Sequence, residues 1–174
     1  EPRGICLSHA NVVANVGAIV SGVGGQQAGD VIVSWMPLYH DMGLIGGLLV
    51  SLVTTGGRLE PIPSVLFSPH DFIRQPSLWL RMLAKYRATV GLAPNFGYQL
   101  CADRVHAAAL DGVDLSSVRI LLNGSEPVSQ NEATRFERAY ATLGLRRGCV
   151  RPCYGLGENS LAVTISPVGN EIRT

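Results

Sequence analysis

The sequence predicts an α/β fold in which a mainly parallel sheet is flanked by helices. Two observations support this prediction. Residues 31–33 are β-branched and apolar without the alternation typical of a half-exposed strand, and further short buried strands are expected along the chain, as at residues 117–122. Segments with helical periodicity separate these strands, and strands that alternate with helices form parallel sheets through right-handed crossovers.

The first elements follow from local signals. Ser8 is placed to cap a helix over residues 9–20, where apolar side chains recur at helical spacing. Residues 31–53 then predict a buried strand, a corner at Pro37, a polar cluster and an apolar helix that contains three glycines. The rest of the chain is organised around this stretch, because it combines a buried strand with a polar loop at the strand's carboxyl end.

The remaining elements continue the alternation of strand and helix. Ser68 followed by Pro69 predicts the start of a short helix through residue 73, and Ser129 with Glu132 has the spacing of a capping box. Thr54 to Gly57 is expected to end the central helix. Further strands are expected at residues 58–62, 89–93, 117–122 and 149–154, and further helices at residues 77–87 and 95–109 and after Ser129.

Length and composition fit one compact unit over residues 1–174, with 47% hydrophobic residues. A net charge of +1 with 16% charged residues gives no basic field for nucleic acid. Four cysteines without a CxxC pair indicate reduced thiols and a cytoplasmic setting. The longest apolar run, residues 44–53, is far shorter than the roughly 20 residues of a membrane span, so none is expected. Since the first residue is not Met, we expect the chain to be a fragment of a larger protein.

Polar and glycine-rich corners follow three of the expected strands: PLYHDMG at residues 37–43, NGSEP at 123–127 and YGLGE at 154–158. In a parallel sheet these corners emerge at one edge, so we expect them to converge on a ligand site. Gly124 would let the backbone approach a flat ligand, Tyr154 offers an aromatic face beside Gly155, and the carboxylate of Glu158 could hold Mg²⁺ together with substrate phosphates. Taken alone, NGSEP is equally consistent with an ordinary strand-to-helix turn, and YGLGE is better explained as a Tyr-Gly turn with a capping Glu; the functional interpretation depends on the three corners together.

The central helix and His40 each allow two interpretations. Gly43, Gly46 and Gly47 would let an acyl chain lie against the backbone, or would only let a buried helix pack closely on the sheet. His40 beside Asp41 could act on a substrate or could stabilise the loop. A serine hydrolase is excluded, because no G-x-S-x-G string occurs in the chain.

Six strings resemble one family in the order in which that family carries them. The chain resembles the adenylate-forming superfamily of acyl-CoA synthetases and adenylation domains, and within it the fatty acyl-AMP ligases. The strings are PRGICLSHANV, PLYHDMGLIGGLL, SPHDFIRQPSLWL with KYRAT, APNFGYQLC, DLSSVRILLNGSEPV and PCYGLGENSL. The resemblance implies a subdomain of the N-terminal, AMP-binding domain of an enzyme that converts a fatty acid and ATP into acyl-adenylate and pyrophosphate. It implies ATP and Mg²⁺ as cofactors and an acyl carrier protein, often of a polyketide or lipopeptide synthase, as the acceptor.

Carried over residue by residue, the resemblance implies a catalytic role for His40, beside the carboxylate, and for Glu158, as the Mg²⁺ ligand. It implies that Tyr154 stacks on adenine beside Gly155, with Asn123, Gly124, Ser125 and Glu126 around the adenine and ribose. An acyl tunnel would be bordered by Gly43, Gly46, Gly47, Asn95 and Phe96.

Two departures from the family pattern accompany the resemblance. Arg3 stands where the family's phosphate-loop lysine is common, and the phosphate loop and the C-terminal domain lie outside the sequence, so the isolated chain is expected to be inactive. Two alternatives stay open: a long-chain acyl-CoA synthetase, which differs in its acceptor, and a non-catalytic acyl- or nucleotide-binding module of a larger synthase.

Overall fold

A computed structural model describes residues 4–53 and 61–167. Six strands form one sheet in the order β2-β1-β3-β4-β5-β6, and the first five of them in this order run parallel. β6 pairs antiparallel with β5, so that the two strands form a hairpin at one edge of the sheet. The strands are β1 Ile32–Ser34, β2 Ser64–Leu66, β3 Val90–Ala93, β4 Ile120–Asn123, β5 Val150–Gly155 and β6 Ala162–Ile165.

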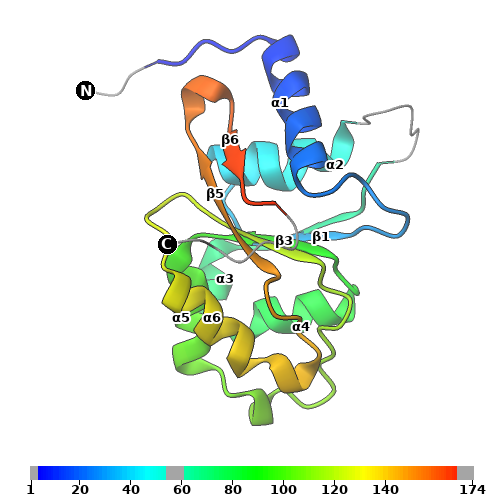
Figure 1. Ribbon diagram of the computed structural model, residues 1–174, viewed down its shortest axis with the longest axis vertical. Helices are drawn as coiled ribbons and strands as arrows, with labels where there is room; N and C mark the ends of the chain where they lie inside the picture. The colour runs from blue at the N-terminus through cyan, green and yellow to red at the C-terminus, as the bar shows by residue number, and fades with distance from the viewer. Residues whose placement is uncertain (1–3, 54–60, 168–174) are drawn as a thin grey trace.

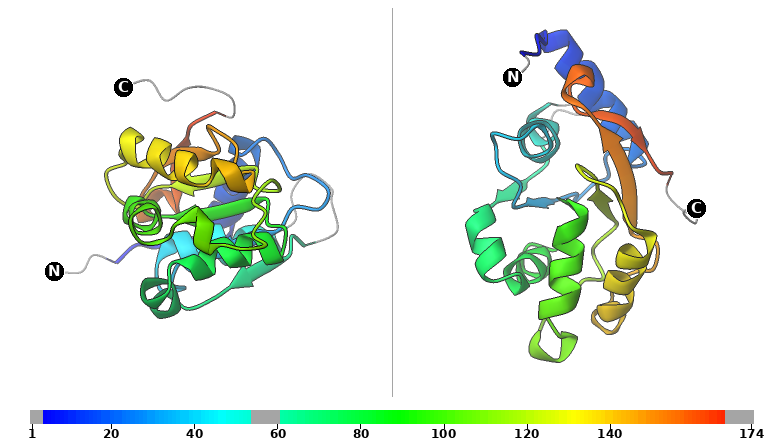
Figure 2. Two further views of the ribbon diagram at one scale, coloured as in Figure 1. Left: turned by 90° about the horizontal axis from the view of Figure 1, so that it is seen from below. Right: turned by 90° about the vertical axis from the view of Figure 1, so that its left-hand side faces the viewer.

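Helices cover both faces of this sheet, as Figures 1 and 2 show. One face carries α1 His9–Gly22, the π-helix η1 Met42–Leu49 and the short α2 Val50–Leu52. The other face carries α3 Pro69–Arg74, α4 Ser77–Lys85, α5 Asn95–Arg104 and α6 Gln130–Ala139. Three 3₁₀ turns complete the described elements: η2 Ala107–Ala109, η3 Ala141–Leu143 and η4 Gly157–Asn159. The predicted α/β class with a mainly parallel sheet is confirmed.

The predicted helix starts at Ser8, Ser68 and Ser129 are formed, but the capping box expected for Ser129 and Glu132 is only half formed, because the N–H of Ser129 donates to the Oδ1 of Asn95. The Oγ atom of Ser8 accepts a hydrogen bond from the backbone N–H of Asn11 at 3.2 Å, and the Asn11 side chain accepts one from the Ser8 N–H, which makes a capping box. Ser68 caps α3 with Pro69 in its first turn, and Ser129 caps α6 by accepting from the N–H of Glu132.

Aromatic rings in stacked and edge-to-face contact pack on the face of the sheet that carries α3 to α6. Trp35, directly after β1, stacks on Phe72 with ring centroids 3.9 Å apart and meets Trp79 edge to face. Aromatic pairs in such geometries add to the gain from burying their area. The cluster therefore ties the carboxyl end of β1 to the helices below it: Trp35, Phe72, Trp79, Tyr98, Phe136 and Tyr140 are all almost fully buried.

Several expected boundaries were wrong. β2 lies at Ser64–Leu66, and residues 61 and 62 of the strand expected at 58–62 are not part of it. Residues 58–60 lie outside the described residues, as do the expected stop at residues 54–57 and Arg3. The helix expected over residues 95–109 ends at Arg104, because Val105 has an extended backbone. β6 was not expected at all, although its sequence, Ala-Val-Thr-Ile, is rich in β-branched residues.

Among the described residues, no helix combines the length and the apolar character needed to cross a lipid bilayer.

Candidate active site

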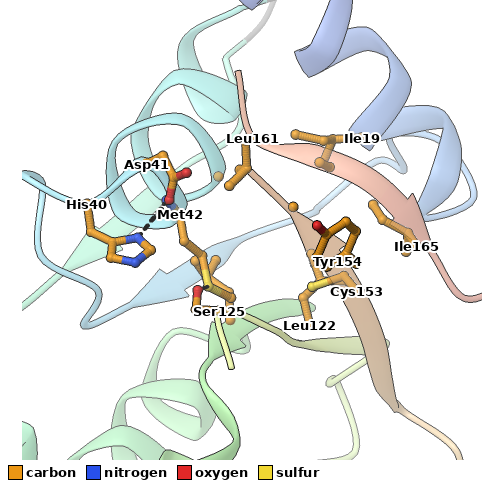
Figure 3. Close-up of a pocket in the computed structure, with 14 residues that line it drawn as sticks. Ile19, His40, Asp41, Met42, Leu122, Ser125, Cys153, Tyr154, Leu161 and Ile165 are labelled. Carbon is orange, nitrogen blue, oxygen red and sulfur yellow. Dashed lines mark hydrogen bonds and ion pairs between the residues drawn. The ribbon is translucent and has the colours of Figure 1, made fainter. Parts of the chain in front are cut away.

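The corners that follow β1, β4 and β5 meet around one cavity of about 180 Å³, here called the central cavity. His40 and Met42 approach it from the start of η1, Ser125 from the loop after β4, and Tyr154 from β5 (Figure 3). The predicted convergence is thus formed for these three corners. The full lining is Ile19, His40, Asp41, Met42, Gly46, Leu92, Leu122, Ser125, Cys153, Tyr154, Gly155, Leu161, Ala162 and Ile165.

Two further cavities adjoin the central cavity. The Tyr154 cavity, of about 530 Å³, is lined by Ser125, Glu126, Pro127, Val128, Pro152, Cys153, Tyr154, Gly155, Thr164 and Ser166. The Phe96 cavity, of about 330 Å³, is lined by Trp35, Met36, Pro37, His40, Pro69, Ile73, Pro94, Phe96, Ser125 and Glu126. Ser125 belongs to all three linings, so the loop after β4 stands at their junction.

The three glycines of η1 face different neighbours. Gly46 lines the central cavity, where a Cβ atom would lie 3.2 Å from a methyl carbon of Leu161. At Gly43 a Cβ would collide with the backbone carbonyl of Pro37, and at Gly47 it would lie 3.2 Å from the Oγ of Ser34 on β1. Gly46 therefore has the position expected of a tunnel residue, whereas Gly43 and Gly47 match the alternative interpretation, close packing of the helix on its surroundings.

Asn95 and Phe96 lie at the start of α5 and do not border the central cavity. The Oδ1 atom of Asn95 accepts hydrogen bonds from the Nδ2 of Asn123 at 3.1 Å and from the backbone N–H of Ser129 at 3.0 Å. The ring of Phe96 meets Trp35 edge to face, with centroids 5.8 Å apart, in the wall of the Phe96 cavity.

Ser125 has a strained backbone. Its φ angle of +70° lies in the left-handed region, which non-glycine residues adopt at an energetic cost, and its hydroxyl donates a hydrogen bond to the Sδ of Met42 at 3.1 Å. Gly124 packs on β5, where a Cβ atom would lie 2.7 Å from the Sγ of Cys153. Asn123 is completely buried at the end of β4.

Tyr154 offers an open aromatic face, since 60% of the residue is exposed. Its ring lies between the central cavity and the Tyr154 cavity, beside Gly155, which packs directly against the backbone of Leu161. The ring can thus stack on a flat ligand in the Tyr154 cavity.

His40 and Asp41 surround the first N–H group of η1. The N–H of Met42 lies within hydrogen-bond distance of the Oδ1 of Asp41, at 2.7 Å, and of the Nδ1 of His40, at 3.1 Å. Nδ1 also lies 2.8 Å from the Asp41 carboxylate. Because Nδ1 is engaged locally, any contact between His40 and a substrate would use Nε2.

Glu158 differs from the other residues of the three corners in its surroundings. It is exposed on η4, and none of the three cavities has it in its lining. Across residues 4–53 and 61–167, no group of three or more His, Cys, Asp or Glu side chains could hold a metal ion. A metal ion at Glu158 would therefore need further ligands from a bound substrate. Mg²⁺ is commonly bound in this way, by one carboxylate together with substrate phosphates.

The walls that α1 and the residues of β6 contribute to the central cavity were not expected from the sequence. Ile19 and Ile165 close the central cavity on the side opposite η1, and Leu161 lies against Gly46 of η1 (Figure 3). Cys153 lines both the central and the Tyr154 cavities, and burial raises the pKa of its thiol to about 11. The β-branched run after Leu161 was the available signal for this wall, because it predicts a strand beside β5.

The model of the family described as AMP-binding enzyme matches residues 1–174. The chain belongs to this family. The medium-chain-fatty-acid acyl-carrier-protein ligase TtuA of Teredinibacter turnerae is 37% identical over 171 residues, which are 98% of this chain and 26% of that protein. The probable long-chain-fatty-acid AMP ligase FadD30 of Mycobacterium tuberculosis is 36% identical over 175 residues, covering 98% of this chain and 29% of FadD30.

A solved fatty acyl-adenylate ligase shares the fold. The crystal structure of a fatty acyl-adenylate ligase from Legionella pneumophila, in complex with acyl adenylate and pyrophosphate, aligns with a TM-score of 0.88 and 37% identity. The alignment covers 97% of this chain and 29% of that one. The predicted resemblance to fatty acyl-AMP ligases is confirmed, and the chain spans less than a third of the length of each of these relatives.

Proposed function

We propose that the chain is the part of a fatty acyl-AMP ligase that holds both the fatty acid and the adenylate. The observation that carries this proposal is the shared wall of two cavities. The central cavity is bordered mainly by apolar side chains, the neighbouring cavity has the exposed ring of Tyr154, and Ser125, Cys153, Tyr154 and Gly155 line both. A fatty acid in the central cavity and a nucleotide in the Tyr154 cavity would have the carboxylate and the α-phosphate near these shared residues.

The reaction requires this proximity more than it requires a nucleophilic side chain. An oxygen of the fatty acid carboxylate attacks the α-phosphorus of ATP, the bond from that phosphorus to the bridging oxygen breaks, and pyrophosphate leaves with the electron pair. Holding the two groups in line supplies much of the rate enhancement in such a transfer. In this assignment Tyr154 stacks on adenine, the backbone of Gly124 to Glu126 borders it, and Nε2 of His40 faces the carboxylate.

Glu158 would hold Mg²⁺ with one carboxylate, in agreement with its isolated and exposed position. When bound, the ion neutralises charge that develops on the phosphate oxygens. The acyl group is then transferred to the phosphopantetheine thiol of an acyl carrier protein that serves lipid or polyketide synthesis. The names of relatives such as TtuA support an acceptor of this kind. We place the reaction in the cytoplasm, which agrees with the free thiols of Cys6, Cys101, Cys149 and Cys153.

Fatty-acid-dependent exchange of pyrophosphate into ATP tests this function in the full-length protein that contains the chain. We expect exchange with medium- or long-chain acids, accumulation of acyl-adenylate, and transfer to a carrier protein in preference to free CoA. Efficient formation of acyl-CoA would instead establish the acyl-CoA synthetase alternative. Binding of acid and nucleotide without any exchange would establish a non-catalytic module.

The thiol of Cys153 reports on whether the shared wall is covered by ligand. Because the thiolate is the reactive form and the pKa is about 11, alkylation of Cys153 should be slow at pH 7.5 and rise about tenfold per pH unit up to that value. We expect a non-hydrolysable acyl-adenylate analogue to slow alkylation at pH 9.5 at least about fivefold, as followed by mass spectrometry. The exposed Cys6 is the internal control and should keep its rate. Equal rates at Cys153 with and without the analogue would place the ligand elsewhere.

A further inference from the structure

The loop from Asn123 to Ser129 is fixed to the first turn of α5 at three points. Asn95 accepts hydrogen bonds from the Nδ2 of Asn123 and the N–H of Ser129, which are the two ends of the loop. The backbone N–H of Phe96 donates to the Oε1 of Glu126, in the middle of the loop, at 2.6 Å. The first two residues of one helix thus hold the beginning, middle and end of a loop about 30 residues further along the chain.

The contact with Glu126 is electrostatically favourable. The N–H groups of the first helical turn lack partners within the helix, and the helix macrodipole places partial positive charge there. A carboxylate that accepts a short hydrogen bond from one of these groups makes a charge-assisted contact. Glu126 therefore does for α5 what a capping side chain does, although the side chain comes from a distant part of the sequence.

This contact bears on the strained residue beside it. Ser125 keeps a φ of +70° between Gly124, which is packed on Cys153, and Glu126, which is held by Phe96. A non-glycine residue stays in the left-handed region only where its surroundings determine its conformation. Ser125 is also the residue that lines all three cavities, so its conformation sets the wall between them.

We propose that Glu126 is a positioning residue: its carboxylate holds the loop on α5 and so keeps Ser125 in place beside the nucleotide, instead of binding the nucleotide itself. The proposal rests on the proposed function for the identity of the ligand. The family resemblance implied a place for Glu126 around the adenine and ribose. The structure places it in the lining of the Tyr154 cavity, with Oε1 committed to the backbone of α5.

The test compares E126A and E126Q in the full-length protein, because glutamine keeps an oxygen that can accept from the Phe96 N–H. Hydrogen exchange of a peptide that covers the first turn of α5 is measured together with KM for ATP and kcat. We expect E126A to accelerate exchange in this peptide and to raise KM for ATP about fivefold, with kcat changed less. E126Q should restore most of the protection and most of the apparent affinity.

The control is D103A, which removes an exposed carboxylate from the same helix. Asp103 pairs with Arg135 near the other end of α5, and its loss should alter neither readout. Raised KM for ATP in E126A with unchanged protection of the α5 peptide would mean that Glu126 contacts nucleotide directly, and would overturn the proposal. Faster hydrogen exchange in the α5 peptide of E126A with an unchanged KM for ATP would also overturn the proposal. If the wild-type protein shows no fatty-acid-dependent pyrophosphate exchange, the proposed function fails. The hydrogen-exchange comparison of E126A with E126Q still decides whether Glu126 holds the loop.

Discussion

Replacing Glu158 by alanine in the full-length protein should lower pyrophosphate exchange into ATP by at least about 100-fold. The reason is that the proposed function makes this carboxylate the Mg²⁺ ligand supplied by this part of the protein. It is exposed on η4, and the part of the chain that the structure describes offers no cluster of metal-ligating side chains. Loss of charge neutralisation at the transferring phosphorus has an effect of this size. The measurement is the exchange rate at saturating fatty acid over a range of Mg²⁺ concentrations.

The matched control for this experiment is Asp111→Ala. Asp111 is an exposed carboxylate in the turn between η2 and β4, at the opposite end of the strands from the three corners, so exchange should stay within about twofold of the wild-type rate. E158D should retain part of the activity with a higher Mg²⁺ requirement. Exchange that is unaffected in E158A would remove Glu158 from the metal site.

Replacing Gly46 by leucine should shift the substrate preference toward shorter acids. Gly46 faces the central cavity, where even a Cβ atom comes within 3.2 Å of Leu161, so the leucine side chain would occupy space that we assign to the acyl chain. Displacing about four methylenes at ~0.8 kcal/mol each costs about 3 kcal/mol of binding, or roughly 100-fold in kcat/KM for a long acid. The ratio of kcat/KM values for a long and a short acid is the quantity to measure.

A substitution on the outer side of the same helix separates a change of cavity from a change of helix. Leu44 is 40% exposed and does not line the central cavity, so L44F should leave the preference unchanged. The midpoint of thermal unfolding should be recorded for both variants, because leucine at position 46 also requires Leu161 to move. A chain-length profile in G46L that matches the wild type would show that the fatty acid does not pass Gly46.

The sequence alone determined the fold class, which depends on local and repeated signals, and the family, which six strings in order indicate. The caps at Ser8 and Ser68 act within three residues, and the alternation of apolar strand and amphipathic helix predicts a parallel sheet without knowledge of which side chains meet. The rule that parallel strands present their carboxyl ends at one edge placed His40, Ser125 and Tyr154 together, as the structure does.

Only the tertiary structure decided which way the candidate side chains face. Gly43, Gly46 and Gly47 were equivalent in the sequence. In the π-helix η1, Gly46 faces the central cavity, whereas Gly43 packs against Pro37 and Gly47 against Ser34. The bond from Phe96 to Glu126 joins residues 30 positions apart, and the β6 wall depends on a chain reversal after Glu158. The physical reason is that propensity and capping act over one turn or one strand. The direction of a side chain and the partner of a carboxylate are instead set by packing between elements far apart in the chain.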